Sequence, residues 1–174
     1  MSNILDELTI KFDRYSKYTQ KEQQNIINLL KMIFDDGEHE HDPNLFDQTY
    51  VLCFYYKTHL VGCICAMDNF DMQKNMSDFV QRRDSMHIDY GRKGCFIYNL
   101  AVIKVMRKKG LGESLLKVLQ HYLGRITDYF HVQIKVGNKG SEHIFEKMGF
   151  KEYKRLNNGY YDFNIYTKNI KNEK

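Results

Sequence analysis

The sequence predicts a mixed α/β fold, an α+β arrangement in which helices flank one central mixed sheet. Three observations carry this prediction. A near-continuous apolar run, Cys95 to Ile103, suits a strand buried on both faces. A glycine-containing turn follows it, and the segment after the turn repeats apolar residues at helical spacing, including Leu111, Leu115, Tyr122 and Ile126. Shorter segments elsewhere alternate apolar and polar residues, as half-buried strands do.

The N-terminal part of the chain predicts one strand and one helix. Residues 8–13 alternate apolar and polar side chains, with Ile10 on the face expected to be buried. Thr19 and Glu22 have the spacing of a capping box, in which each residue satisfies the backbone N–H of the other. Apolar residues then recur at helical spacing, so we expect a helix over about residues 20–34.

A hairpin and a long polar segment come next. Residues 49–57 and 60–67 are rich in β-branched and aromatic side chains and are separated by two residues, which predicts two antiparallel strands. Gly62, inside the second strand, indicates a bulge or close packing. Residues 68–93 are polar and irregular, and the only helical spacing in them is that of Met76, Phe79, Val80 and Ile88, which would line one short helix. This segment is either a functional loop or a surface insertion.

The C-terminal part predicts a strand, a short helix and a hairpin. Residues 130–136 alternate apolar and polar side chains, and residues 139–148 form a helix that Gly149 would end. Residues 151–156 and 160–167 flank an Asn-Asn-Gly turn, which is a strong hairpin signal.

Composition narrows the class of protein. The 174 residues, 43% of them hydrophobic, suit a single domain over 1–174 with frayed tails at 1–7 and 168–174. The net charge of +4 is mild and no dense basic stripe is present, which argues against nucleic acid as the main partner. The sequence shows no signal peptide and no span long enough for a bilayer. Four cysteines in apolar runs indicate buried free thiols, so we expect a soluble cytoplasmic protein.

The basic turn Arg107–Gly112 has the composition of an anion site. A helix N-terminus presents free backbone N–H groups, and phosphate is the anion most often bound there. The two glycines would let the backbone approach a ligand closely. The alternative is a tight connection between strand and helix with solvated lysines. The glycine spacing fits neither a P-loop nor a dinucleotide-binding fingerprint.

This turn, with Leu-Ala-Val before it, resembles motif A of the GNAT superfamily of acetyl-CoA-dependent N-acetyltransferases. Residues 138–150 resemble the family's second landmark, an Asn after a strand and then a short helix ending in Glu-Lys-x-Gly-Phe. The two landmarks together are far more specific than either one. The resemblance implies the GNAT-like acyl-CoA N-acyltransferase fold, acetyl-CoA as co-substrate, and an acetyl group transferred to a primary amine.

The resemblance also implies roles for individual residues. Asn138 would reach the pantetheine or thioester region, although an N-cap role for it is the alternative. Phe145 would line the thiol end of the cofactor. Leu100 and Val102 would offer backbone groups to the pantetheine arm. The pyrophosphate would be held by Arg107, Lys108, Lys109, Gly110, Leu111 and Gly112.

The sequence departs from the family at the positions that carry chemistry. Phe145 stands where many members have a tyrosine general acid, and Tyr98 and Asn99 stand where members often have an acidic base. Tyr98 is therefore the first candidate catalytic residue, with packing in the core as the alternative. Secondary candidates are His87, Asp89, Tyr90, Tyr160 and Tyr161. No role is assigned to His121, His131 and His143, which fall on predicted surface faces.

The identity of the acceptor is predicted from fewer residues than the cofactor is. Residues 35–42 form an acidic run with two histidines, by default a solvated loop and too weak a pattern to predict a metal site. Because the resemblance places this segment near the acceptor, its carboxylates would attract a cationic amine such as a polyamine. Protein lysine or N-terminal acetylation, a non-catalytic CoA-binding domain and a nucleic-acid adaptor are the alternatives. No cysteine occupies a nucleophile position, so transfer would be direct; monomer and homodimer are both open.

Overall fold

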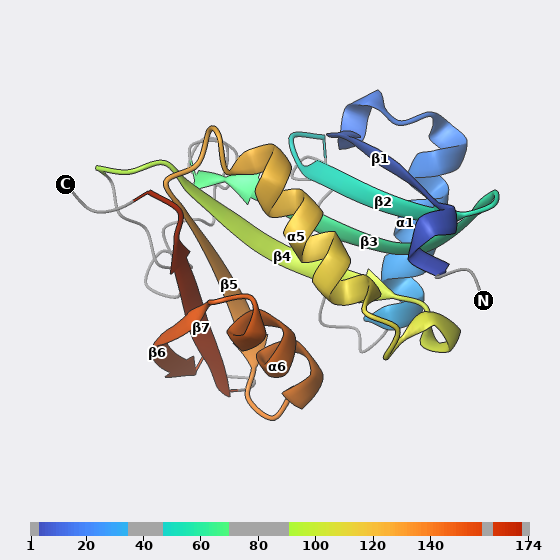
Figure 1. Cartoon of the computed structure of the whole chain (residues 1–174). Helices are drawn as coiled ribbons and strands as arrows, with labels where there is room; N and C mark the ends of the chain where they lie inside the picture. The colour runs from blue at the N-terminus through green and yellow to red at the C-terminus, as the bar shows by residue number, and fades with distance from the viewer. Residues whose placement is uncertain (1–3, 35–46, 70–90, 158–161, 172–174) are drawn as a thin grey trace. The chain divides into compact units, whose positions relative to one another are not determined.

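The computed structural model describes residues 4–34, 47–69, 91–157 and 162–171 (Figure 1). Within these ranges, seven strands pair in the order β1-β2-β3-β4-β5-β7-β6. The pair β4–β5 is parallel and β1–β2, β2–β3, β5–β7 and β6–β7 are antiparallel, so the predicted mixed sheet with flanking helices is confirmed. The strands are β1 Leu8–Arg14, β2 Tyr50–Tyr56, β3 His59–Asp68, β4 Gly94–Val102, β5 Tyr129–Lys135, β6 Lys151–Asn157 and β7 Asp162–Asn169, and the α-helices of the described ranges are α1 Gln20–Ile33, α5 Leu111–Leu123 and α6 Lys139–Lys147.

The chain groups into two compact units. The first takes residues 1–66 and 99–119, and the second takes residues 67–98 and 120–174. The strands β3 and β4 and the helix α5 each contribute residues to both units.

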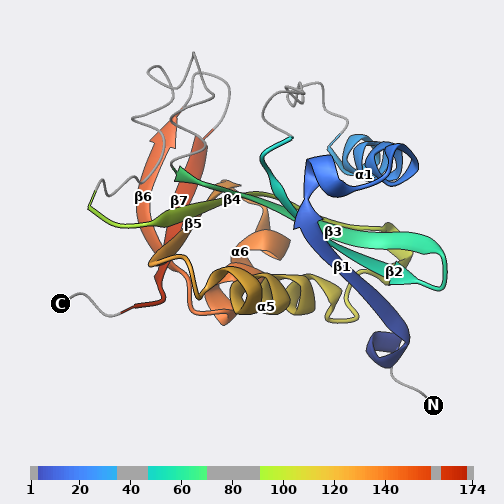
Figure 2. The same ribbon diagram turned by 90° about the horizontal axis from the view of Figure 1, so that it is seen from above.

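In the first unit, two helices cover opposite sides of the strands (Figure 2). Gly62 of β3 explains how closely α5 approaches, because a Cβ there would lie 3.1 Å from both Ala101 O and Leu115 Cδ1. The register of the β2–β3 pair also shifts beside Gly62, between Phe54 and Tyr55. Both interpretations of this glycine, a bulge and close packing, are therefore confirmed.

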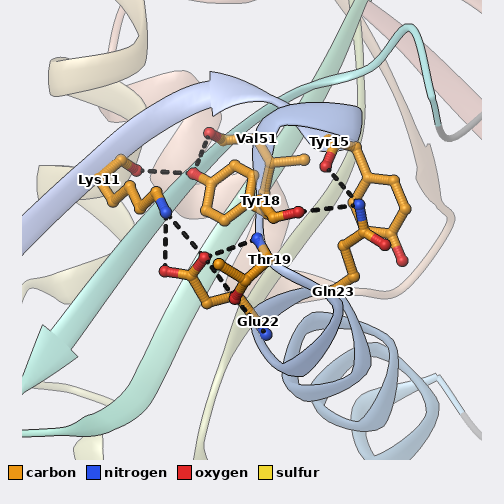
Figure 3. Close-up of polar contacts among 7 residues, drawn as sticks. All are labelled: Lys11, Tyr15, Tyr18, Thr19, Glu22, Gln23 and Val51. Carbon is orange, nitrogen blue, oxygen red and sulfur yellow. Dashed lines mark hydrogen bonds and ion pairs between the residues drawn. The ribbon is translucent and has the colours of Figure 1, made fainter.

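The N-terminus of α1 is fixed by the predicted capping box (Figure 3). Glu22 N donates to Thr19 Oγ1 at 3.3 Å, and Thr19 N donates to Glu22 Oε2 at 2.9 Å. Lys11 of β1 adds two hydrogen bonds to the same carboxylate, at 2.7 and 2.8 Å from its Nζ. The helix therefore begins at Gln20, where the sequence predicts it. The Glu22 carboxylate also links the helix to β1 through Lys11.

A buried tyrosine completes this attachment (Figure 3). Tyr18 is 3% exposed, and its hydroxyl lies 3.0 Å from Lys11 O and 2.8 Å from Val51 O. Burial raises the pKa of Tyr18 well above its usual range. The neutral hydroxyl therefore links the turn before α1 to β1 and β2.

Three apolar side chains predicted to be buried are exposed. Ile10 is 45% exposed because α1 packs on the face of β1 that carries Lys11, and β1 is an edge strand. Ile126 is 52% exposed because it lies beyond the end of α5 at Leu123. Tyr122 is 45% exposed within the helix, although Leu119 and Leu123 beside it are buried. The leucines of α5 at positions 111, 115, 116, 119 and 123 are buried, as predicted.

In the second unit, α6 ends as its glycine predicts. Gly149 has φ of +85°, and Phe150 N donates to Phe145 O at 3.0 Å, which closes the helix in the usual glycine-terminated form. Lys168 Nζ donates to Met148 O at 2.7 Å, so β7 is tied to the end of α6. Residues 4–7 form a 3-10 helix and residues 168–169 belong to β7. Regular structure therefore extends into both segments that were predicted to be frayed tails.

The structure also bears on the predicted state of the cysteines and on the predicted absence of a membrane span. All four cysteines are free and buried. Among the described residues, no helix is long and apolar enough to cross a membrane.

The Glu22 carboxylate predicts a pH-dependent stability. Burial alone would raise its pKa, but hydrogen bonds from Lys11 and Thr19 outweigh burial and hold the pKa below its ordinary value. A lowered pKa stabilises the fold above the unfolded-state pKa, and this contribution is lost as pH falls through the folded-state pKa. Glu22→Gln should therefore lower the free energy of unfolding by about 0.5–1 kcal/mol at pH 7. In thermal unfolding the difference should shrink as pH falls below the ordinary glutamate pKa of ~4.3 and vanish below the folded-state pKa; a difference independent of pH would contradict this account.

Candidate functional site

The candidate anion site lies in the first unit, between β4 and α5. The chain leaves β4 at Val102 and makes a short 3-10 turn, Lys104–Met106, whose Met106 side chain is buried. Arg107, Lys108, Lys109 and Gly110 follow and are all exposed. A strand buried in the sheet and a buried methionine therefore hold an exposed basic loop in place.

The loop turns into the helix through two residues with left-handed backbone conformations. Lys108 has φ of +60° and Gly110 has φ of +81°. A Cβ at Gly110 would meet no atom of the described residues within 4 Å, so these residues leave the space beside it open. The helix begins at Leu111, which places Leu111 and Gly112 in its first turn rather than in the loop. Leu111 is 1% exposed, so only its backbone can contribute to a site.

The N-terminus of α5 differs from those of α1 and α6. The first N–H groups of a helix have no partner inside the helix. Thr19 caps α1 and Asn138 caps α6, each with a side-chain oxygen. Gly110, the residue before α5, has no side chain to offer. The first turn of α5 therefore combines N–H donors, the positive end of the helix dipole and open space, which is the arrangement that binds anions.

Charge strengthens this preference for an anion. Arg107 Nε donates to Val102 O at 3.0 Å, which holds the guanidinium beside the end of β4. Lys108 and Lys109 are exposed on the same loop. The residues fit a diphosphate, because several convergent N–H donors and three cations meet its charge, and the glycine leaves room for it. Leu100 and Val102, proposed for the pantetheine arm, are half-buried in β4.

In the second unit, Asn138 occupies the N-cap of α6. Its Oδ1 accepts from Ser141 N at 3.3 Å, so the alternative role weighed for it, helix capping, is confirmed. Glu142 is 7% exposed and accepts from Lys139 Nζ at 2.8 Å and from Gly137 N at 3.3 Å. The hydrogen bond from Lys139 lowers the pKa of Glu142, although burial opposes this. The charges of Lys139 and Glu142 are therefore paired with each other. A cofactor role for Asn138 stays a prediction.

Phe145 and Tyr98 lie in different surroundings. Phe145 is 2% exposed and its ring meets Phe150 edge-on, with centroids 5.0 Å apart. Tyr98 is half-buried and stacks on Phe96, with centroids 6.1 Å apart. Its ring therefore packs against a neighbour while part of it stays accessible. The secondary candidates His87, Asp89, Tyr90, Tyr160 and Tyr161, and the acidic run 35–42, lie outside the described residues.

The sequence reasoning missed a buried polar group in the second unit and misplaced one of its members. His131 was expected on a surface face, yet it is fully buried, with its Nε2 at 2.9 Å from Asn69 Oδ1. The expectation was wrong because β5 is buried on both faces. The strand begins at Tyr129, and this aromatic residue shares a face with His131. An aromatic residue two positions before the histidine was the signal available. His121 and His143 are exposed, as expected.

Cys53 and Cys63 are unsuited to nucleophilic catalysis. Burial raises the pKa of Cys53, and a hydrogen bond with Cys65 together with burial raises that of Cys63. A thiol reacts as its thiolate, so these groups are inert at neutral pH. Among the described residues, no three His, Cys, Asp or Glu side chains are grouped so as to hold a metal ion.

Comparison with known proteins agrees with this arrangement. Residues 12–150 match the family model of the acetyltransferase (GNAT) family. The fold is similar to Arabidopsis thaliana NAA60 in complex with a bisubstrate analogue, with a TM-score of 0.69 and 14% identity over 92% of this chain and 98% of that one. It is also similar to a GNAT acetyltransferase from Elizabethkingia anophelis with acetyl-CoA bound, with a TM-score of 0.65 and 15% identity over 94% and 99% of the two chains.

A third structure extends the range of bound ligands. Arabidopsis thaliana Naa50 in complex with the bisubstrate analogue CoA-Ac-MVNAL has a TM-score of 0.65 and 16% identity, over 91% of this chain and 97% of that one. No curated protein sequence matches the chain. The family model covers most of the sequence, including both landmarks and every strand from β2 to β5. The chain therefore belongs to the GNAT family of acetyltransferases.

Proposed function

We propose that this acetyltransferase uses acetyl-CoA to acetylate a primary amine by direct transfer, in the cytoplasm. The observation that carries the proposal is the N-terminus of α5. Gly110 opens it with φ of +81° and open space, and exposed cations at 107, 108 and 109 surround it. The similar folds determined with acetyl-CoA or a bisubstrate analogue bound support the same cofactor.

The chain's own residues would divide the task of binding. The Arg107–Gly110 loop and the first turn of α5 would hold the diphosphate through backbone N–H groups and charge. The β4 backbone at Leu100 and Val102 would hold the pantetheine arm, and the resemblance assigns Asn138 and Phe145 to the pantetheine and thiol ends. The cofactor would supply the acetyl group as an activated thioester.

Proton transfer is the demanding part of the reaction. A free alkylamine has a pKa of ~10.4 and is mostly protonated at neutral pH, so the site must remove a proton before transfer. Phe145 cannot donate or accept a proton, and Tyr98 is the candidate for a polar contact at the acceptor. Positioning of the amine can supply ~7–11 kcal/mol of the barrier, more than acid–base groups usually add. Buried thiols of raised pKa support direct transfer without an acetylated cysteine.

Two classes of acceptor remain in competition. The acidic run 35–42 favours a small cationic amine such as a polyamine. The similarity to a structure holding CoA-Ac-MVNAL favours the second class, a peptide N-terminus or a protein lysine. The two classes are separated by comparing the acetylation rates of spermidine and of the peptide Met-Val-Asn-Ala-Leu, each measured by the release of the coenzyme A thiol.

We expect acetyl-CoA to raise the melting temperature of the wild-type protein and not that of Gly110→Glu. A carboxylate at Gly110 would repel the diphosphate and occupy its space. A ligand at ~100 times its Kd adds ~2.7 kcal/mol, which is several degrees for a chain of this size. Gly149→Glu is the matched control, because Gly149 has a similar φ of +85° and the same charge is introduced at the other end of a different helix. An equal shift in all three proteins would show that the loop only connects two elements.

Neutralising the acidic run should discriminate between acceptors. If a cationic amine is the acceptor, replacing Asp35, Asp36, Glu38 and Glu40 by their amides should raise the KM for spermidine severalfold, because those carboxylates attract the cation. The KM for acetyl-CoA should stay within twofold, measured by thiol release. An unchanged spermidine KM would remove the polyamine, and cofactor-induced stabilisation without turnover on either acceptor would favour a non-catalytic domain.

A further inference from the structure

A buried polar network in the second unit joins three residues far apart in sequence. Asn69 lies just beyond β3. Its Nδ2 donates to Tyr129 Oη at 2.7 Å, and its Oδ1 is 2.9 Å from His131 Nε2. Asn69, Tyr129 and His131 are 6%, 1% and 0% exposed. Burying an amide, a phenol and an imidazole is costly unless their polar atoms are hydrogen-bonded. We call these residues the Asn69 network.

The neighbouring strand is shaped around this network. Gly94 lies directly opposite Tyr129 in the β4–β5 register. A Cβ at Gly94 would lie 2.2 Å from Asn69 Nδ2 and 2.4 Å from Tyr129 Cζ. Any side chain there would displace the Asn69–Tyr129 hydrogen bond. The network and the start of β4 therefore fit together only with glycine at this position.

Ring contacts lead from the network to Tyr98. Phe96 lies directly opposite His131 in the β4–β5 register, and their ring centroids are 5.0 Å apart. The Phe96 ring in turn stacks on the Tyr98 ring, with centroids 6.1 Å apart and an interplanar angle of 26°. Side chains two residues apart on a strand share a face, so His131, Phe96 and Tyr98 form one line of rings. Phe96 and Tyr98 are half-buried, whereas the network behind them is buried.

The orientation of the amide determines which nitrogen of His131 carries the proton. Asn69 Nδ2 faces the Tyr129 hydroxyl, so its carbonyl oxygen faces His131 Nε2. An oxygen acceptor requires a donor opposite it, so His131 is protonated at Nε2. The hydrogen bond also fixes the plane of the imidazole ring against which Phe96 packs.

We propose that Asn69 is a positioning residue for the acceptor end of the reaction. By holding His131 as its Nε2–H tautomer, it fixes the ring that supports Phe96, and Phe96 sets the angle at which Tyr98 is presented to the amine. This inference rests on the proposed role of Tyr98 at the acceptor. It assigns a function to Asn69, His131 and Phe96 that does not require any of them to touch the substrate.

The decisive test compares two replacements of His131. Gln carries an N–H close to the position of His Nε2, so His131→Gln keeps the donor to Asn69, whereas His131→Leu removes it. With the better acceptor of spermidine and Met-Val-Asn-Ala-Leu, His131→Leu should raise the acceptor KM at least fivefold and leave the acetyl-CoA KM within twofold. His131→Gln keeps the hydrogen bond to Asn69 but loses the ring against Phe96, so its acceptor KM should lie between those of the wild type and His131→Leu, with the acetyl-CoA KM near wild type. Exposed His143→Leu is the control for substitution itself and should change neither.

Gly94→Ala tests the network without removing a polar group. Its Cβ would push Asn69 away from Tyr129, so this variant should reproduce the acceptor defect of His131→Leu. If both variants lower the melting temperature and leave the acceptor KM unchanged, the network is purely structural and the proposal is overturned. If His131→Gln loses kcat at an unchanged acceptor KM, the imidazole takes part in the chemistry, and that result also overturns a positioning role.

NMR separates this inference from the proposed function. In the wild-type protein, ¹⁵N spectra should show the proton of His131 on Nε2, and the Tyr98 ring resonances should move farther in His131→Leu than in His131→Gln, which keeps the hydrogen bond to Asn69. These readouts need no acceptor, so they hold even if neither amine is acetylated. A proton on Nδ1, or Tyr98 resonances that are the same in both variants, would overturn the positioning role whatever the enzyme assay shows.

Discussion

The N-terminus of α5 is the constraint on which the first unit depends. A helix that begins after glycine has no side chain at its N-cap, and burying the body of that helix fixes where its first N–H groups lie. Gly62 lets Leu115 and the β4 backbone pack within 3.1 Å of its Cβ position, and Met106 anchors the turn before the basic loop. Packing therefore places the start of α5 at the surface, where an anion can accept hydrogen bonds from its first N–H groups.

Two glycines, one at the start of β4 and one in the loop after it, show opposite uses of a missing side chain. At Gly110 the space is open and the backbone is left-handed, which is the condition for a ligand to approach. At Gly94 the space is filled by Asn69 and Tyr129, so the glycine serves an internal hydrogen bond. In the function proposed here, Gly110 belongs to the loop that would bind the cofactor, and Gly94 to the network that would orient Tyr98. A GNAT acetyltransferase needs both, because binding the cofactor and presenting the amine are separate tasks.

Local patterns predicted much of this structure, and they failed where distant residues decide the outcome. The capping box, the Gly149 stop and the leucine stripe of α5 were predictable because each depends on neighbours within one helical turn. Ile10 was misplaced because the sequence does not show which face of β1 a helix will cover. His131 was misplaced because its partner, Asn69, is 62 residues away. The resemblance predicted a cofactor loop at residues 107–112, whereas the sequence near His131 offered only Tyr129 as a signal of burial and none for Asn69.

The central claim is that backbone N–H groups at the start of α5 bind the diphosphate of coenzyme A. A titration of ¹⁵N-labelled protein with coenzyme A tests it most directly. The account predicts that the amides of Gly110, Leu111 and Gly112 show the largest shifts, while those of Gln20 and Lys21 in the capped first turn of α1 stay unchanged. Saturable binding with unchanged amides at positions 110–112 would contradict it, because the cofactor would then be held elsewhere.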